Sequence, residues 1–301
     1  MSINLVVYNG LCNRLIPLIS CYRIAKLYNK HLNILWNGPP VRSCINYTDN
    51  KPCLFEDIFE KLEGVSIVNQ EEFEKLTIKS DKVYKFHYEN CKKLVIEPEK
   101  YENICIYLAL YPILLQTDNI KDYIEFTLDS EKSSDGLFQN EIFKQLKISF
   151  NCLKPIKEVQ QIIDNVYEKF SKNMIGLHIR KTDGGFTHMN WNEIDKVLIS
   201  KLKHWVKQNL DNKIFLATDC KKTQNKYKFY FNNRIIFYNP KQTKFDNNHF
   251  NVICGVVDLF LLSKCNIAII GTLASSFSLT SGLLSNIPLW LVKNEKSPIP
   301  I

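Results

Sequence analysis

The stretch that decides the fold is MIGLHIRKTD at positions 174–183, an apolar run that leads into a polar cluster and then Gly184-Gly185. The apolar part predicts a β-strand, and a strand that ends in charged residues at a glycine turn is typical of ligand-binding edges in α/β proteins. His178 and Arg180 are two residues apart, so an extended chain presents both side chains on one face. Two such groups need an anionic partner, which is either a bound ligand or a carboxylate elsewhere in the chain.

Strands and helices alternate from this stretch to the C-terminus. The apolar periods predict strands at 174–179, 213–217, 234–237, 267–270 and 288–292, with helices at 193–210, 221–230, 250–263 and 275–284 between them. Such alternation is typical of a doubly wound parallel sheet.

The first half of the chain opens with the same alternation. A strand at 3–8, a helix at 14–30 and a strand at 31–36 form a β-α-β unit, which implies parallel strands joined by a right-handed crossover. Further strands are predicted at 65–68, 82–86 and 104–106, and helices at 71–76, 140–146 and 155–170. We therefore expect an α/β protein with two Rossmann-like β/α/β domains, residues 1–153 and 154–301, that face a central cleft.

The composition is that of an ordinary globular protein, with 301 residues, 45% hydrophobic and 23% charged. The net charge of +8 suits an acidic partner, but the lysines are scattered, so we expect a small anionic ligand and no nucleic acid. The ten cysteines form no C-x-x-C pair, which predicts reduced thiols and no zinc site. Because we find no signal segment and no long apolar run, we expect no membrane span and a cytoplasmic protein.

Polar residues follow three predicted strands of the second domain. They are His178, Arg180 and Asp183, then Thr218 and Asp219, then Gly271-Thr272 before Ser275-Ser276-Phe277-Ser278. Carboxyl ends of parallel strands share one sheet edge, so these groups should converge. The last set opens a helix whose N–H groups and serine hydroxyls would suit phosphate oxygens, although a serine before a helix is usually a plain N-cap, which the loop taken alone favours. The predicted proximity of Arg180 favours the anion-binding alternative, because a guanidinium and a helix N-terminus together suit a pyrophosphate.

Two more polar residues are candidates for ligand contacts. Asp258 lies in the apolar helix segment VVDLFLLS at 256–263, where a lone carboxylate needs a donor. One alternative is a donor within the protein, from a lysine or a neighbouring helix end. The other is a guanine base, which donates from its N1 and its exocyclic amine. Asn13 precedes the first predicted helix, so we expect it to be the N-cap, with a ligand contact across the cleft as the alternative.

Several common nucleotide and hydrolase motifs are absent from the sequence. It has no G-x-x-x-x-G-K-[ST], no G-x-G-x-x-G, no Asp-x-Asp, no G-x-S-x-G and no H-E-x-x-H. P-loop kinases, dinucleotide-dependent dehydrogenases and metal-dependent Asp-x-Asp sugar transferases are therefore disfavoured.

Motifs along nearly the whole chain resemble the GDP-fucose-dependent fucosyltransferase superfamily, which includes α1,2-, α1,6- and protein O-fucosyltransferases. They are Gly10-x-x-Asn13-Arg14, His178-x-Arg180-Lys181-x-Asp183, Ala217-Thr218-Asp219, and Asp258-Leu-Phe-Leu-Leu-Ser263 followed by Ser275-Ser276-Phe277-Ser278. The stretch from about 40 to 150 carries no match. The resemblance implies a GT-B fold and an inverting, metal-independent transfer of fucose from GDP-fucose to a glycan hydroxyl, without any cofactor. Its second domain would bind the donor, and the first would be the acceptor side.

The resemblance also implies roles for individual residues. Arg180 would hold the β-phosphate, His178 and Asp258 the guanine, Ser275, Ser276 and Phe277 the phosphate and ribose, and Asp219 would support the pocket. Relatives carry two arginines where this chain has Arg180-Lys181, so the second cation is retained but its bidentate geometry is lost.

The general base is less clear, because the glutamate that serves some relatives beyond the motif is absent from GGFTH at 184–188. His188 is our candidate, since its intrinsic pKa suits a base at neutral pH, and Asp183, Glu193 and Asp195 compete with it. Two alternatives for the whole chain stay open. One is a GT-B transferase with a different nucleotide sugar, and the other is a nucleotide- or glycan-binding relative without turnover.

Overall fold

The computed structural model describes residues 1–8, 10–36, 53–85, 94–108, 113–115, 141–181, 189–239, 247–273, 275–297, 299 and 301. Contacts divide the chain into two compact units, and the first takes in residues 1–127, 140–156 and 245–252. The second takes in residues 128–139, 157–244 and 253–301. The acceptor and donor roles expected for residues 1–153 and 154–301 stay predictions.

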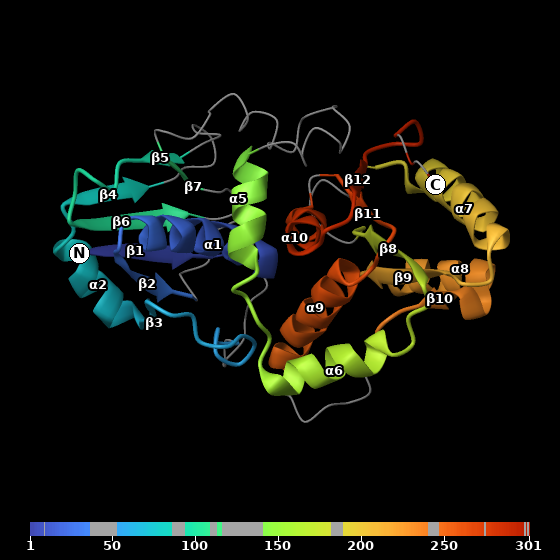
Figure 1. Cartoon of the computed structure of the whole chain (residues 1–301), viewed down its shortest axis with the longest axis horizontal. Coiled ribbons are helices and arrows are strands. Elements are labelled where there is room, and N and C mark those ends of the chain that lie inside the picture. Colours follow the sequence, from blue (N-terminus) through green and yellow to red (C-terminus); the bar gives the residue numbers. More distant parts are fainter. Residues whose placement is uncertain are drawn as a thin grey trace. The chain divides into compact units, whose positions relative to one another are not determined.

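The first unit is built on a five-stranded parallel sheet in the order β3-β2-β1-β6-β4. Its strands are β1 (Ser2–Val7), β2 (His31–Leu35), β3 (Val65–Ile67), β4 (Lys82–Lys85) and β6 (Asn103–Leu108). The central strand β1 is buried along nearly its whole length, as expected for a strand covered on both faces. Figure 1 shows these strands in blue and teal beside the helices α1 (Leu11–Leu27) and α2 (Gln70–Ile78).

The first helix begins three residues earlier than predicted, which corrects the expected role of Asn13. The N-cap of α1 is Gly10, so Asn13 is the third residue of the helix and does not cap it. The small strands β5 (Leu94–Ile96) and β7 (Ile113–Leu115) were not predicted. Residue Ile113 is held by Ser20 of α1, whose Oγ lies 2.7 Å from both its N and its O. Contacts between residues so far apart in the sequence leave no local pattern.

The second unit contains another five-stranded parallel sheet, in the order β10-β9-β8-β11-β12. Its strands are β8 (Asn173–Ile179), β9 (Asn212–Thr218), β10 (Ile235–Ile236), β11 (Ala268–Thr272) and β12 (Leu289–Val292). From β8 the chain builds outward to β9 and β10, and then returns to the other side of β8 with β11 and β12. The order of the strands therefore reverses between β8 and β11, which makes this the topological switch point of the sheet.

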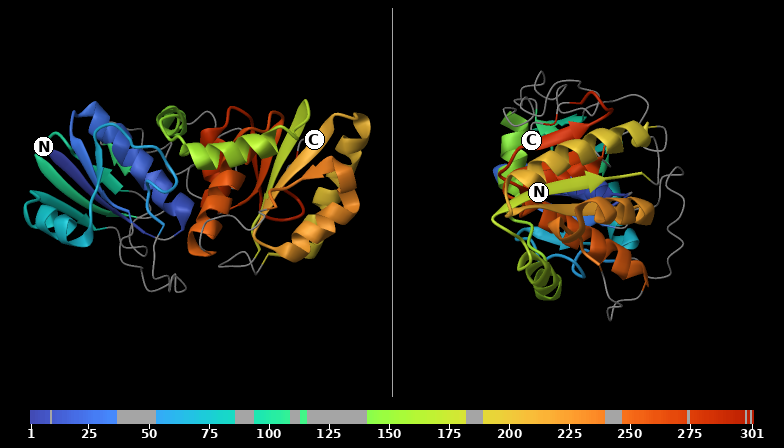
Figure 2. Two further views of the ribbon diagram at one scale, coloured as in Figure 1. Left: turned by 90° about the horizontal axis from the view of Figure 1, so that it is seen from below. Right: turned by 90° about the vertical axis from the view of Figure 1, so that its right-hand side faces the viewer.

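Helices cover both faces of the second sheet, as Figure 2 shows. On one face α7 (Trp191–Gln208) and α8 (Lys221–Phe231) pack against Ile175, Leu177 and Ile179 of β8 in one hydrophobic cluster. On the other face lie α9 (Asn247–Ser263) and α10 (Ser276–Leu284), which approach β8 and β11 closely. Two glycines permit this approach. A Cβ at position 176 would lie 3.0 Å from Leu262 of α9, and one at position 271 would clash with Ser278 of α10.

Two parallel sheets with interleaved helices confirm the predicted α/β class. Helices α5 (Glu141–Phe150) and α6 (Lys157–Tyr167) also match predicted helices. No helix in the described ranges is long and apolar enough to cross a membrane.

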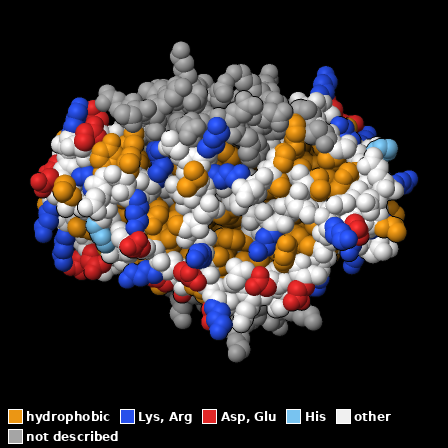
Figure 3. Space-filling view, viewed as in Figure 1, with side chains coloured by type: hydrophobic (Ala, Val, Ile, Leu, Met, Phe, Trp, Pro, Cys, Tyr) orange, Lys and Arg blue, Asp and Glu red, His pale blue; other side chains and the backbone are white. Residues whose placement is uncertain are grey.

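On the face drawn in Figure 3, Lys and Arg side chains are interspersed with Asp and Glu among the described residues. The described part of that face therefore lacks the continuous basic stripe typical of nucleic-acid-binding surfaces.

Candidate functional site

The carboxyl ends of β8, β9 and β11 meet at the switch point of the second sheet, where side chains join them. The backbone N–H of Arg180 donates to Oγ1 of Thr272, at 3.0 Å, and that hydroxyl donates to the carbonyl of His178, at 3.2 Å. The backbone N–H of Lys181 donates to Oδ1 of Asp219, at 3.0 Å. The predicted convergence of these three strand ends is confirmed.

Arg180 follows directly after β8 and lies beside Asp219. Its Nε atom is 3.9 Å from Oδ2 of Asp219, and 35% of the Arg180 side chain is exposed. The ion pair holds the guanidinium at the sheet edge, and the exposed part of the side chain is open to solvent. A partly exposed ion pair of this length adds little stability, so it is better suited to orienting the guanidinium than to holding the fold together.

His178 is a buried residue near the end of β8, and its side chain contacts α10. Its Nδ1 atom lies 2.7 Å from Oγ of Ser278, and its ring stacks on Phe277 with 4.7 Å between the ring centroids. Burial and the nearby Arg180 charge lower the pKa of His178 to about 3, against an opposing effect of Asp219. At neutral pH the imidazole is therefore uncharged, and Arg180 supplies the positive charge of this pair.

The N-terminus of α10 faces this cluster, since its residues Phe277 and Ser278 contact His178. Ser275 occupies the N-cap position with an extended backbone, and it is 4% exposed. Its side chain makes no capping hydrogen bond, and the first turn contains no acidic residue. The N-cap position predicted for Ser275 is thus confirmed, but no side chain of the cap or the first turn offsets the partial positive charge of the helix end. Ser276 and Phe277 are both partly exposed there.

Asp258 is a buried carboxyl group of α9. Its Oδ1 atom is buried and has no hydrogen-bond partner among the described residues. Burial raises the pKa of Asp258 well above its usual range, which favours the protonated form. The pKa values of Tyr238 and Cys254 are raised to about 12, chiefly by burial of these two side chains and in part by the charge of Asp258. Asp258 therefore lies near both residues. In the described part of the chain no lysine pairs with Asp258, so its acceptor atom is unused.

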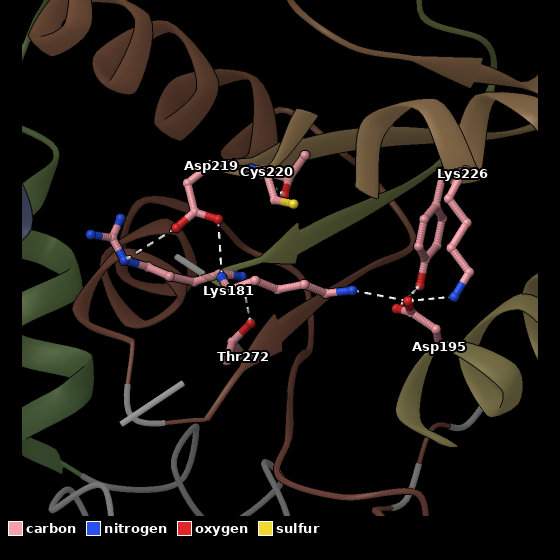
Figure 4. Close-up of polar contacts among 9 residues, drawn as sticks. Lys181, Asp195, Asp219, Cys220, Lys226 and Thr272 are labelled. Atoms are coloured by element: carbon pink, nitrogen blue, oxygen red, sulfur yellow. Dashed lines mark hydrogen bonds and ion pairs between the residues drawn. The ribbon is translucent and has the colours of Figure 1, made fainter. Parts of the chain in front are cut away.

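Lys181 points away from the Arg180 guanidinium. Its Nζ lies 2.9 Å from Oδ2 of Asp195 on α7 (Figure 4). It also lies 4.7 Å from the ring centroid of Trp191. The second cation that the sequence retains at position 181 is therefore engaged on the α7 face, where its ammonium group pairs with Asp195. Lys181 and Arg180 point in different directions because neighbouring side chains of an extended chain point to opposite faces.

The candidates for the general base fall into two groups. Asp195 is 2% exposed and Glu193 pairs with Lys196 at 2.6 Å. Asp195 is a poor candidate, because its carboxylate is hidden from an acceptor and already accepts hydrogen bonds from Lys181 and Lys226. The other two candidates, Asp183 and His188, lie outside the described residues.

Asn13 lies in the first turn of α1, in the first unit. Its Oδ1 atom is buried and accepts no hydrogen bond from the described residues. The adjacent Arg14 is 6% exposed and stacks over Trp36, with 4.7 Å from Cζ to the ring centroid. Asn13 therefore has an unused acceptor, and the predicted ligand contact stays a prediction.

The sequence identified three residues that shape this site, but not the contacts that they make. Thr272 was noted only as a strand end, and Ser278 only as part of a serine-rich turn. Asp195 was weighed as a base, although its position between Ile194 and Leu198 on the buried face of α7 is the same signal that identified Asp258. A polar residue on an apolar helix face indicates a buried polar partner, and here that partner is Lys181. Across the described ranges, no group of three or more His, Cys, Asp and Glu side chains could hold a metal ion.

Solved structures similar to this chain include fucosyltransferases, some of them with GDP or GDP-fucose bound. The fucosyltransferase NodZ from Bradyrhizobium aligns with a TM-score of 0.59 and 17% identity, over 97% of this chain and 96% of NodZ. A variant of Arabidopsis thaliana FUT1 in complex with GDP aligns with a TM-score of 0.53 and 13% identity, over 99% of this chain and 71% of FUT1. POFUT1 in complex with GDP-fucose aligns with a TM-score of 0.54 and 10% identity, over 96% and 97%. No protein-family model and no curated protein sequence matches this chain. At the level of the fold, the resemblance seen in the sequence motifs is confirmed.

Proposed function

We propose that this chain is a glycosyltransferase that moves fucose from GDP-fucose to a glycan hydroxyl, with inversion at the anomeric carbon and without a metal ion. The observation that carries the proposal is the cluster of Arg180, Asp219, Thr272 and the α10 N-terminus at the switch point of the second sheet. A guanidinium next to an uncapped helix N-terminus suits a diphosphate. The GT-B arrangement of two domains around a cleft is part of the proposal.

The donor site follows from the chemistry of the groups that are present. Arg180 and the first-turn N–H groups of α10 would hold the diphosphate, with Ser275, Ser276 and Phe277 along the phosphate and ribose. Asp219 would keep the guanidinium oriented from β9. Asp258 would accept from the N1 and exocyclic amine of guanine, and its unused Oδ1 acceptor supports this role. His178 would lie beside the base as a neutral group.

The proposed reaction exchanges one C–O bond for another. The acceptor oxygen attacks the anomeric carbon of fucose, the bond from that carbon to the β-phosphate oxygen breaks, and GDP leaves with the bonding electrons. A base takes the proton of the acceptor hydroxyl, and we assign this role to His188, with Asp183 as the competing residue. Negative charge grows on the leaving diphosphate, and Arg180 together with the α10 N-terminus stabilises it. Because these groups can carry that charge, the proposal needs no metal or other cofactor.

Two alternatives give different results in the same experiments. A transferase with another donor, such as GDP-mannose or a UDP-sugar, would share the phosphate site but differ at the base or the sugar. An inactive relative would bind the nucleotide without turnover. The unused acceptor of Asp258 favours guanine over uracil, because guanine presents two adjacent donors. A cytoplasmic location remains part of the proposal.

Two measurements test the proposal. The first compares thermal stabilisation by GDP, UDP, ADP and CMP, each with and without EDTA. The proposal expects stabilisation by GDP alone and no effect of chelation, and stabilisation by UDP alone would contradict it. The second incubates GDP-fucose with candidate glycan acceptors and measures released GDP. GDP binding without release across a broad acceptor panel would favour the inactive relative.

A further inference from the structure

A single buried carboxylate ties the residue after Arg180 to two helices. Asp195 of α7 accepts from Nζ of Lys181 at 2.9 Å, from Nζ of Lys226 at 2.7 Å, and from the hydroxyl of Tyr227 at 3.1 Å. Both ammonium groups contact the same oxygen, Oδ2, while the phenol contacts Oδ1. Figure 4 shows Lys181 reaching from the end of β8 to this carboxylate, with Lys226 on its far side.

The arrangement is costly if its purpose is stability alone. The side chain of Asp195 is 3% exposed and that of Lys181 is 14% exposed, so both charges have lost most of their water. Buried ion pairs repay desolvation only when their geometry is good, and apolar replacements of the same volume are often as stable. Two ammonium groups on one carboxylate also leave a net charge of one in the cluster. A role in fixing a conformation explains this better than a stability role does.

The segment that this carboxylate fixes is the one that carries Arg180. The N–H of Arg180 is bound by Thr272 and the N–H of Lys181 by Asp219, so two successive peptide groups are held by neighbouring strands. Asp195 adds a third attachment through the Lys181 side chain. Because adjacent side chains of an extended chain point to opposite faces, anchoring Lys181 toward α7 directs Arg180 away from α7.

We propose that Asp195 is a positioning residue for Arg180, which acts through Lys181 and sets the direction of the guanidinium in the donor site. This inference rests on the proposed function of that site. Without the carboxylate, the two ammonium groups would repel each other and Lys181 would leave the α7 face. The backbone at 180 and 181 would keep its peptide hydrogen bonds to Thr272 and Asp219 but lose the attachment through the Lys181 side chain, and Arg180 would lose its preset orientation.

The test measures GDP affinity in the full chain with four single variants and one double variant. Lys181→Met and Asp195→Asn should each raise the Kd for GDP about tenfold, the loss expected when a binding group is misplaced. The double variant should be no weaker than either single one, because both changes break the same link. Lys181→Arg, which keeps a cation of similar reach, should restore most of the affinity. Lys226→Met is the matched control, since it removes a cation from Asp195 but leaves Lys181 paired.

The control separates positioning from stability. Lys226→Met should lower the unfolding temperature. The Kd for GDP should stay within about twofold of wild type, which is the scatter expected between sites that do not interact. Equal losses of GDP affinity in Lys226→Met and Lys181→Met would overturn the inference. If the wild type binds GDP, an unchanged Kd in both Lys181→Met and Asp195→Asn would also overturn it. If Asp195→Asn does not fold, Lys181→Met decides. A wild type that does not bind GDP at all would overturn the proposed function and this inference with it.

Discussion

The Nδ1 atom of His178 lies 2.7 Å from the Oγ atom of Ser278, and this hydrogen bond ties the end of β8 to the first turn of α10. Ser278 comes this close because position 271 of the neighbouring strand is a glycine. A Cβ atom at that position would lie 2.5 Å from both Cβ and Oγ of Ser278. The proposed anion site therefore depends on the absence of one methyl group on β11.

The substitution Gly271→Ala should displace α10 from β8 and weaken GDP binding. The added methyl group meets the Cβ of Ser278, so a rotation of the serine side chain cannot relieve the clash. We expect a loss of about 1–3 kcal/mol in the free energy of unfolding, as for other overpacked sites. Urea denaturation measures this loss, and titration with GDP measures the loss of affinity.

Gly282→Ala, in the last turns of the same helix, is the control for this prediction. A Cβ at position 282 would lie 2.7 Å from Cδ2 of Leu289, which is the end of a flexible side chain. This variant should lose stability but keep its GDP affinity, because the N-terminus of α10 stays in place. If Gly271→Ala binds GDP as tightly as wild type, the helix N-terminus does not form part of the site.

Acid should destabilise the protein through His178. The pKa of His178 is lowered to about 3 in the folded chain, chiefly by burial, while an unfolded histidine titrates near 6.5. Stability from this group is therefore present above pH 6.5 and is lost as the pH falls toward 3. Denaturant titrations between about pH 7 and pH 4 should show a flatter pH dependence in His178→Gln than in wild type. Equal slopes would mean that His178 is not held neutral by the fold.

Asp258 should make the ligand-free protein less stable as the pH rises. Its folded pKa is raised, so the folded state prefers the protonated acid, whereas the unfolded chain ionises near about pH 4. The stability from this group is complete below the unfolded pKa and is lost as the pH rises through the folded pKa. The amide that Asp258→Asn introduces carries no charge at any pH. Relative to wild type, this variant should gain stability from about pH 4 upward, and a constant difference would contradict the prediction.

Binding of GDP should release a proton from Asp258. Guanine offers two donors, which favour the ionised carboxylate, so GDP lowers the pKa that burial has raised. Affinity should therefore rise with pH, by at most about tenfold per pH unit for one proton. Calorimetry in buffers of different ionisation enthalpy measures the released proton. Asp258→Asn should bind GDP more weakly and remove this contribution to the pH slope, whereas an unchanged slope would place the guanine elsewhere.

Local sequence patterns predicted most of the fold. The alternation of strand and helix patterns identified every strand of both large sheets, because most of these strands are short apolar runs; β4, with the sequence KVYK, is the exception. The strand-end residues His178, Arg180 and Asp219 could be placed at one edge because parallel strands must share it. Strands β5 and β7 were missed. Each has three residues, as β3 does, and a run this short is identified in one place and missed in another.

Features that depend on contacts between distant residues could not be predicted in the same way. The direction of Lys181 is set by Asp195, and the helix start at Leu11 makes Asn13 an internal residue of α1. The raised pKa of Asp258 depends on burial by elements that the sequence does not order in space. In each case the residue type suggested an interaction, but the partner came only from the tertiary structure.

The most direct test of the central claim is the affinity of Arg180→Ala and Arg180→Lys for GDP, measured by calorimetry against the wild type. The account predicts that the wild type binds GDP, that Arg180→Ala loses at least about tenfold in affinity, as for a charged hydrogen bond to phosphate, and that Arg180→Lys recovers only part of it. Guanosine without phosphates should bind the wild type and Arg180→Ala equally. Wild-type affinity for GDP in Arg180→Ala would contradict the account.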